Sequence, residues 1–295
     1  MPLATHSLKA DLLLVLVTLL AAISWMFSKE ALAEIPPLLF IGSRFLLAGC
    51  FLAIFCRRSL IGLNARQWIA SAQVGVLFGS AMCLWIFGLF YSKNLGEGAF
   101  ITSIASILVA PVSYFIFKDK IERSNWIALP VALIGLALLS LEHGFHPEAS
   151  QLFFLAAASL LSLTFILNGR AAKHMSATAL TAISLVFVGG MAITISAFIE
   201  TWPEQTTSSM MQWLLLSALI GTSARFLLQT YAQGLTTPSH AAVVMVLEPI
   251  WTGLMAALWF DERMSGLQIT GCALIFAALL VNRWSNLRSW LKTKM

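Results

Sequence analysis

Residues 36–56 read PPLLFIGSRFLLAGCFLAIFC, an apolar stretch of 21 residues in which Arg44 is the only charged side chain. A helix needs about 20 largely apolar residues to cross the roughly 30 Å hydrocarbon core of a bilayer. The stretch therefore predicts a transmembrane helix. Because a helix rises about 1.5 Å per residue, Arg44 would lie near the middle of the bilayer. Ionisable side chains are costly there, so Arg44 is a candidate functional residue.

The rest of the chain repeats this pattern. Hydrophobic residues make up 59% of the 295 residues and charged residues only 11%, whereas soluble domains carry about 25% charged residues. The sequence therefore predicts an all-α polytopic membrane protein of ten transmembrane helices joined by short loops. The expected spans are 11–28, 36–56, 67–91, 97–117, 124–141, 150–168, 177–198, 209–232, 237–259 and 265–282.

The distribution of Lys and Arg predicts the orientation. With a cytoplasmic N-terminus, thirteen of these residues lie on the inner side and three on the outer side, while Arg44 and Arg225 lie within spans. Inner loops are the ones that carry excess positive charge. We therefore expect a multi-pass protein of the bacterial inner (plasma) membrane with both termini in the cytoplasm. The four cysteines have no metal-like spacing, so neither a metal nor a cofactor is expected.

The two halves of the chain resemble each other. A shift of 143 residues places Asp119 on Glu262 and aligns a loop, an apolar helix, a charged turn and a second apolar helix. Five helices in each half is an odd number, so the second half would be inverted relative to the first. Two inverted five-helix repeats, residues 1–145 and 146–295, are typical of carriers that expose one site alternately to each side.

Several short motifs also resemble those of a known family. They are Arg44, Leu247-Glu248-Pro249 and Phe260-Asp261-Glu262-Arg263, with Gly96-Glu97-Gly98-Ala99 and Phe117-Lys118-Asp119-Lys120 in the first half. This pattern is similar to the drug/metabolite transporter superfamily, in particular its EamA-type members with ten helices in two repeats. The resemblance covers nearly the whole chain and implies a transporter, with export as its direction. Ser106 departs from the repeat, because it stands where the counterpart of Pro249 is expected.

Arg44 and Glu248 are expected to reach similar depths from the two halves. Arg44 could hold a substrate carboxylate or phosphate, and Glu248 could take up a proton. Alternatively, the two side chains form a buried pair that only fixes helix packing. Pro249 has no backbone N–H and frees a carbonyl about one turn earlier. This predicts a kink that faces a wet cavity, with an ordinary kink in a packed helix as the alternative.

Other polar and aromatic residues inside the spans are further candidates. Arg225 snorkels to the headgroups, makes a second anion contact or forms part of the inner gate. Gln229 lies one turn away on the same face. The remaining candidates for substrate binding are Trp25, Trp85, Asn168 and Tyr231, with helix packing as the alternative role of the tryptophans. Glu97 and His240 open helices and are candidates for coupling or gating, or simply polar groups at a helix start.

Together these features predict a secondary transporter of a small polar metabolite, such as an amino acid or related compound, working by alternating access. No nucleotide-binding loop occurs in the sequence, so energy would come from the substrate gradient or from protons. Two intramembrane arginines favour a carboxylate-bearing substrate. Proton-coupled uptake and drug efflux are alternatives. An intramembrane enzyme is a distant one, because no span pairs a nucleophile with a base.

The expected partners follow from this function. They are a small-molecule substrate, the lipid bilayer and, for a coupled carrier, a proton; nucleic acid is not expected. Gly75 and Gly79 form a GxxxG motif, which allows close helix packing. Within one bundle this packing is intramolecular, which predicts a monomer or a weak dimer.

Overall fold

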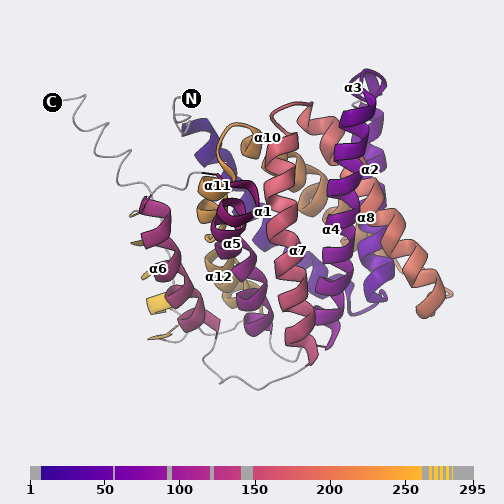
Figure 1. Cartoon of the computed structure of the whole chain (residues 1–295). Helices are drawn as coiled ribbons and strands as arrows, with labels where there is room; N and C mark the ends of the chain where they lie inside the picture. The colour runs from indigo at the N-terminus through magenta and orange to yellow at the C-terminus, as the bar shows by residue number, and fades with distance from the viewer. Residues whose placement is uncertain are drawn as a thin grey trace.

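The computed structural model describes residues 8–55, 57–91, 95–119, 123–140 and 149–260, with short helical pieces between 266 and 281. Within these residues the chain is a bundle of helices without strands (Figure 1). The helices are α1 (Leu8–Ala31), α2 (Pro37–Phe55), α3 (Arg57–Ile61), α4 (Ala65–Tyr91), α5 (Leu95–Phe117), α6 (Arg123–Ser140), α7 (Ala149–Ala171), α8 (Ala177–Ile199), α9 (Ser208–Leu216), the π-helix η1 (Ser217–Ala224), α10 (Arg225–Gly234), α11 (Pro238–Met245) and α12 (Glu248–Phe260).

The long helices have the length and composition of membrane spans. Six apolar segments of the described chain are long enough to cross a bilayer, namely α1, α2, α4, α7, α8 and the continuous run from α9 through η1 to α10. Helix α5 contributes a shorter apolar helix, Ile101–Phe117. Large apolar side chains such as Ile54 and Phe198 are 74% and 84% exposed, which suits contact with lipid rather than with water. The all-helical, polytopic class is therefore confirmed, whereas the tenth expected span, 265–282, is described only in short helical pieces.

Helices α2 and α8 approach each other closely through glycines. A Cβ atom on Gly42 would lie 2.7 Å from the Ile193 backbone nitrogen, and one on Gly49 would lie 2.8 Å from that of Val186. Gly75 and Gly79 of α4 face α8 in the same way. The GxxxG motif thus packs within the chain, as expected.

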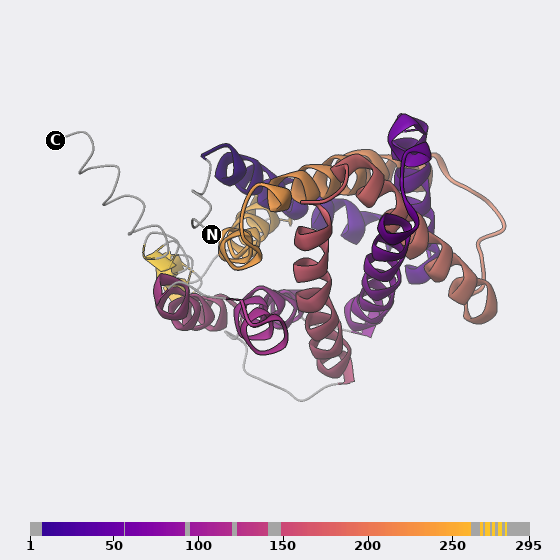
Figure 2. The same cartoon turned by 45° about the horizontal axis from the view of Figure 1, so that its top comes forward.

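The helix contacts of the first half recur in the second half with the partners exchanged. Helix α4 packs on α7 and α8, and the run from α9 to α10 packs correspondingly on α1 and α2. Helix α5 packs on α7, and its counterparts α11 and α12 pack in the same way on α1. The two halves also contact each other through the pairs α2–α8 and α5–α11. The view tilted by 45° shows helices of both halves side by side in one bundle (Figure 2).

The regular α-helix of two expected spans is interrupted: 209–232 contains the π-helix η1, and 237–259 breaks at the step where Pro249 predicts a kink. In the first, Thr222 and Ser223 donate side-chain hydrogen bonds to carbonyls five residues earlier, at 2.8 and 2.9 Å, and so stabilise the wider turns of η1. In the second, α11 ends at Met245 and α12 begins at Glu248. Pro249 lacks the N–H that would bond to the Met245 carbonyl, so the helical ladder cannot continue across this step.

Candidate functional site

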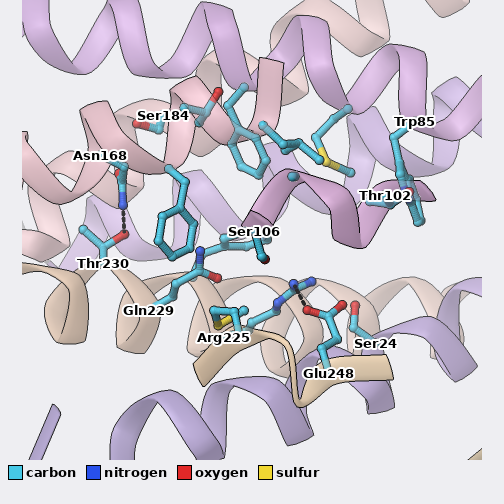
Figure 3. A pocket seen from close by; sticks show the side chains of 18 of the residues that line it. Ser24, Trp85, Thr102, Ser106, Asn168, Ser184, Arg225, Gln229, Thr230 and Glu248 are labelled. Atoms are coloured by element: carbon cyan, nitrogen blue, oxygen red, sulfur yellow. Dashed lines mark hydrogen bonds and ion pairs between the residues drawn. The ribbon is translucent and has the colours of Figure 1, made fainter. Parts of the chain in front are cut away.

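A cavity of about 180 Å³ lies at the centre of the bundle, with residues of α1, α2, α4, α5, α7, α8, α10, α11 and α12 in its wall. On the same measure one water needs about 10–15 Å³. The cavity can therefore hold a small metabolite together with a few waters. Figure 3 shows how polar side chains from different helices converge on it.

An ion pair between Arg225 and Glu248 forms one side of the cavity (Figure 3). Arg225 Nη2 donates to Glu248 Oε2 at 3.2 Å, and Trp25 Nε1 donates to Glu248 Oε1 at 3.0 Å. The side chains of the pair are 16% and 20% exposed, so they reach the cavity without facing bulk water. Arg225 is the first residue of α10 and Glu248 is the first residue of α12. Both interrupted spans therefore place a charged group at the site.

Arg44 is held by hydroxyl groups and not by a carboxylate. Its Nε donates to Thr222 Oγ1 at 3.0 Å, Nη1 to Ser28 Oγ at 2.8 Å and Nη2 to Ser24 Oγ at 3.0 Å. The side chain also lies 5.2 Å from the ring centroid of Phe40, a cation–π contact. The Arg44–Glu248 pair that the sequence left open is therefore not formed, because Arg225 pairs with Glu248 instead. Pairing with Glu248 likewise replaces the snorkelling that was one alternative for Arg225.

A neutral polar network lies at the other end of the cavity. Asn168 Nδ2 donates to Gln233 Oε1 at 2.6 Å and to Thr230 Oγ1 at 3.2 Å. Both bonds connect α7 with α10, and the one between Asn168 and Thr230 is drawn in Figure 3. Gln229 lies one turn before Gln233 on the same face of α10, so Arg225, Gln229 and Gln233 form a polar stripe along the cavity.

Six buried polar atoms of the cavity wall have no hydrogen-bond partner among the described residues. They are Thr102 Oγ1, Thr181 Oγ1, Ser184 Oγ, Arg225 Nε, Gln229 Oε1 and Gln233 Nε2. Buried polar atoms are nearly always satisfied in folded proteins, and exceptions point to water, an ion or a ligand. The clustering of these atoms around one cavity marks it as the place where a polar molecule binds.

An aromatic wall completes the cavity. Trp25 and Trp85 meet edge to face with ring centroids 4.9 Å apart. Phe78 lies between Phe45 and Phe226, at 5.7 and 5.1 Å from their ring centroids. The cavity therefore presents apolar surface beside its charged groups, as small-molecule sites commonly do.

Family models match this chain twice, with the EamA-like transporter family over residues 8–141 and 149–284. The chain belongs to the EamA-like transporter family. Curated proteins of similar length agree with this assignment. The "Uncharacterized transporter YoaV" of Bacillus subtilis is 22% identical over 285 residues, covering 94% of this chain and 97% of that protein.

Two further relatives are named for a substrate class. Each is a "Probable amino-acid metabolite efflux pump", one from Escherichia coli at 24% identity and one from Salmonella typhimurium at 22%. The alignments cover 94% of this chain with each, and 97% and 95% of the respective relatives. A solved structure described as "Crystal structure of protein" superposes with a TM-score of 0.77 at 18% identity, covering 94% of this chain and 98% of its own. The bundle thus has a known fold, and the family makes this EamA-like chain a membrane transporter.

Most of the predicted substrate-binding residues of this EamA-like protein line the cavity. They are Trp25, Arg44, Trp85, Asn168, Arg225, Gln229 and Glu248, together with Pro249. Ser106, the expected counterpart of Pro249, lines it too, although α5 runs through Ser106 without a break.

Three predicted residues lie elsewhere. Tyr231 is exposed and accepts a hydrogen bond from Lys9 Nζ at 2.9 Å, so it does not belong to the cavity wall. His240 is no interfacial cap but is buried, with Nε2 2.7 Å from Asp11 Oδ1 of α1. Glu97 opens α5, but its side chain lies outside the described part of the structure.

The sequence missed the hydroxyl groups that hold Arg44 and line the opposite wall. Ser24 and Ser28 are four residues apart on α1, and Thr181 and Ser184 are three apart on α8, so each pair shares a helix face. This spacing was a usable signal. It is a weak one, because Ser and Thr in membrane helices often bond to a carbonyl of their own helix, as Ser28 does to Ser24 O at 2.6 Å.

Proposed function

We propose that this chain is a secondary transporter that exports a small polar metabolite bearing a carboxylate, such as an amino acid or a related compound, by alternating access. The observation that carries the proposal is the central cavity with the Arg225–Glu248 pair, Arg44 and six unpartnered polar atoms in its wall. The relatives named as efflux pumps supply the direction and the amino-acid class. Two guanidinium groups against one carboxylate also favour an anionic group over a cationic drug.

The proposed architecture is ten helices in two inverted repeats, residues 1–145 and 146–295. The double family match and the exchange of helix contacts between the halves support it. The excess of Lys and Arg in the inner loops supports a bacterial inner-membrane protein with both termini in the cytoplasm. The intramolecular packing of the GxxxG motif supports a monomer or a weak dimer.

Alternating access supplies the mechanism by which such a site would move its substrate. A substrate bound between the halves would be released to either side as they rock around it. Energy would come from the substrate gradient or from a proton, for which Glu248 is the acceptor in the cavity wall. The two gating candidates, Glu97 and His240, open helices of opposite halves; His240 ties α11 to α1 through Asp11.

Uptake into proteoliposomes tests the proposal. The panel holds labelled amino acids, other carboxylates, amines and drug-like cations, each with and without a pH gradient, and efflux from preloaded vesicles tests the direction. We expect saturable flux of carboxylate-bearing compounds and its loss in Arg44→Ala. The variant should still fold, because Ser28 and Thr222 keep their intrahelical acceptors. Arg58→Ala, which changes an exposed arginine of α3, is the matched control. Flux only of cations, or near-normal flux in Arg44→Ala, would contradict the proposal.

A further inference from the structure

The two cavity arginines differ in their capacity to bind a ligand. All three guanidinium nitrogens of Arg44 donate to hydroxyl groups, and only 3% of the residue is exposed. Arg225 makes one contact of 3.2 Å with Glu248, and its Nε is buried without a partner among the described residues. Strong arginine–carboxylate pairs use two nitrogens and distances of about 2.7–2.9 Å. Arg225 is therefore held weakly and has a donor to spare.

Glu248 is held on its other side by a neutral group. Trp25 Nε1 donates to Oε1 at 3.0 Å, which fixes the carboxylate to α1 but brings no positive charge. Among the described residues of the cavity wall, Arg44, Arg225 and Glu248 are the charged ones. If Arg225 turned to another anion, Glu248 would lose the counter-charge that it contacts directly. Leaving a buried charge without its partner is strongly unfavourable.

We propose that the Arg225–Glu248 pair selects the substrate by exchanging partners, so that the site is specific for a compound with a carboxylate and an ammonium on neighbouring atoms. The substrate carboxylate replaces Glu248 on Arg225, and its ammonium replaces Arg225 on Glu248. Two ion pairs then replace one, and neither Arg225 nor Glu248 is left without a counter-charge. This inference rests on the proposed transport function and assigns the selective contacts within that site.

The exchange predicts that each partial substrate binds less tightly than the complete one. A carboxylate without an ammonium takes Arg225 and leaves Glu248 unpaired. An amine without a carboxylate takes Glu248 and leaves Arg225 unpaired. A compound with both groups avoids both costs, so Glu248 determines specificity even though it repels the carboxylate itself. Arg44 supplies positive charge to the cavity and positions the helices around it.

Three compounds with the same side chain test the exchange: leucine, 4-methylpentanoate, which lacks the ammonium, and 3-methylbutylamine, which lacks the carboxylate. Binding to the purified full-length chain is followed by tryptophan fluorescence, since Trp25 contacts Glu248 directly. We expect the wild type to bind leucine at least about tenfold more tightly than either partial compound, equivalent to about 1.4 kcal/mol. Glu248→Gln should reverse the preference in favour of 4-methylpentanoate, and Arg225→Gln should reverse it in favour of 3-methylbutylamine.

Glu30 provides the control for the Glu248 variant. Glu30→Gln changes a carboxylate that also accepts from a tryptophan, Trp259 Nε1 at 3.1 Å, but outside the cavity wall, and should keep the wild-type preference. The proposal is overturned if the wild type binds leucine no better than its partial analogues, or binds none of the three. It is also overturned if the variants that fold keep the wild-type order. If carboxylate flux occurs in the transport panel while this order fails, the exchange is wrong and the transport function stands; absence of any panel flux refutes the function itself.

Discussion

Replacing Gly189 by alanine tests the close approach of α8 to α2. A Cβ atom at this position of α8 would lie 2.7 Å from Leu46 Cα of α2 and closer still to the Leu46 backbone nitrogen. These are backbone atoms, so no side chain can rotate away to make room. Restoring an ordinary contact of 3.4 Å to Leu46 Cα would require the helices to separate by about 0.7 Å. The separation would loosen the pair of helices through which the two halves pack on each other.

The expected cost follows from the known effect of overpacking. Extra methylene groups in a packed core destabilise by about 1–3 kcal/mol. For a chain longer than about 150 residues, each kcal/mol lowers the Tm by about 2–4 °C. We therefore expect Gly189→Ala to lower the Tm by about 2–12 °C, with the upper part of the range favoured because the opposing atoms are backbone.

The next residue provides a matched control. A Cβ atom on Gly190 would meet nothing within 4 Å. Alanine is also a better helix former than glycine by about 0.5–1 kcal/mol, so Gly190→Ala should be as stable as the wild type or slightly more stable. The assay is thermal unfolding of the three purified proteins in one detergent, followed by intrinsic fluorescence and by size-exclusion profile. Equal midpoints for Gly189→Ala and Gly190→Ala would refute the α2–α8 contact described here.

Three further predictions concern the site, the helix break and the exposed turn between α1 and α2. Thr222→Val removes the hydroxyl that accepts from Arg44 Nε, so it should destabilise the protein by about 1–3 kcal/mol and reduce uptake. Thr222→Ser keeps a hydroxyl, so its Tm and its uptake should stay close to those of the wild type. Pro249→Ala supplies the missing N–H and should let the helix close, so we expect an unchanged or higher Tm with slower uptake, and faster uptake would contradict a working break. The hydrogen bond from Thr207 is the largest cause that lowers the pKa of Glu34 from 4.5. The ionised Glu34 carboxylate therefore stabilises the folded protein at pH values above about 4.5, and this contribution is lost as the pH falls through the lowered pKa. The Tm difference between the wild type and Glu34→Gln should therefore shrink between neutral pH and pH about 3, and a difference that grows on acidification would contradict this sign.

The sequence predicted the class of the protein because that class depends on composition along the chain. The expected span 177–198 corresponds to α8, which runs from Ala177 to Ile199. The rule that charges inside a bilayer face the interior placed Arg44 and Glu248 in the cavity wall. Depth along a helix follows directly from counting residues.

The rotation of each helix could not be obtained by counting. Which arginine meets Glu248 depends on the directions in which α2, α10 and α12 face, and these are set by packing over the whole bundle. Arg225 is 23 residues from Glu248 and forms the pair, whereas Arg44 turns to hydroxyl groups of α1 and η1. The contact between His240 and Asp11 joins residues 229 positions apart, so no local sequence pattern predicts it. The π-helix was missed for a related reason, since its wider turns are stabilised by hydroxyl groups that an ordinary helix also tolerates.

The positions of the two interruptions connect recognition with movement. The π-helix η1 ends at Ala224, directly before Arg225, and the break between α11 and α12 directly precedes Glu248. π-Bulges and Pro-broken membrane helices are weak points of the backbone ladder and occur often at functional sites. The ion pair therefore ties together two helices next to the points where each bends most easily, while their counterparts in the first half, α4 and α5, run without interruption. A substrate that opens this pair, as proposed above, would act directly on both weak points, so the same contacts that select the substrate would also release the helices that must move.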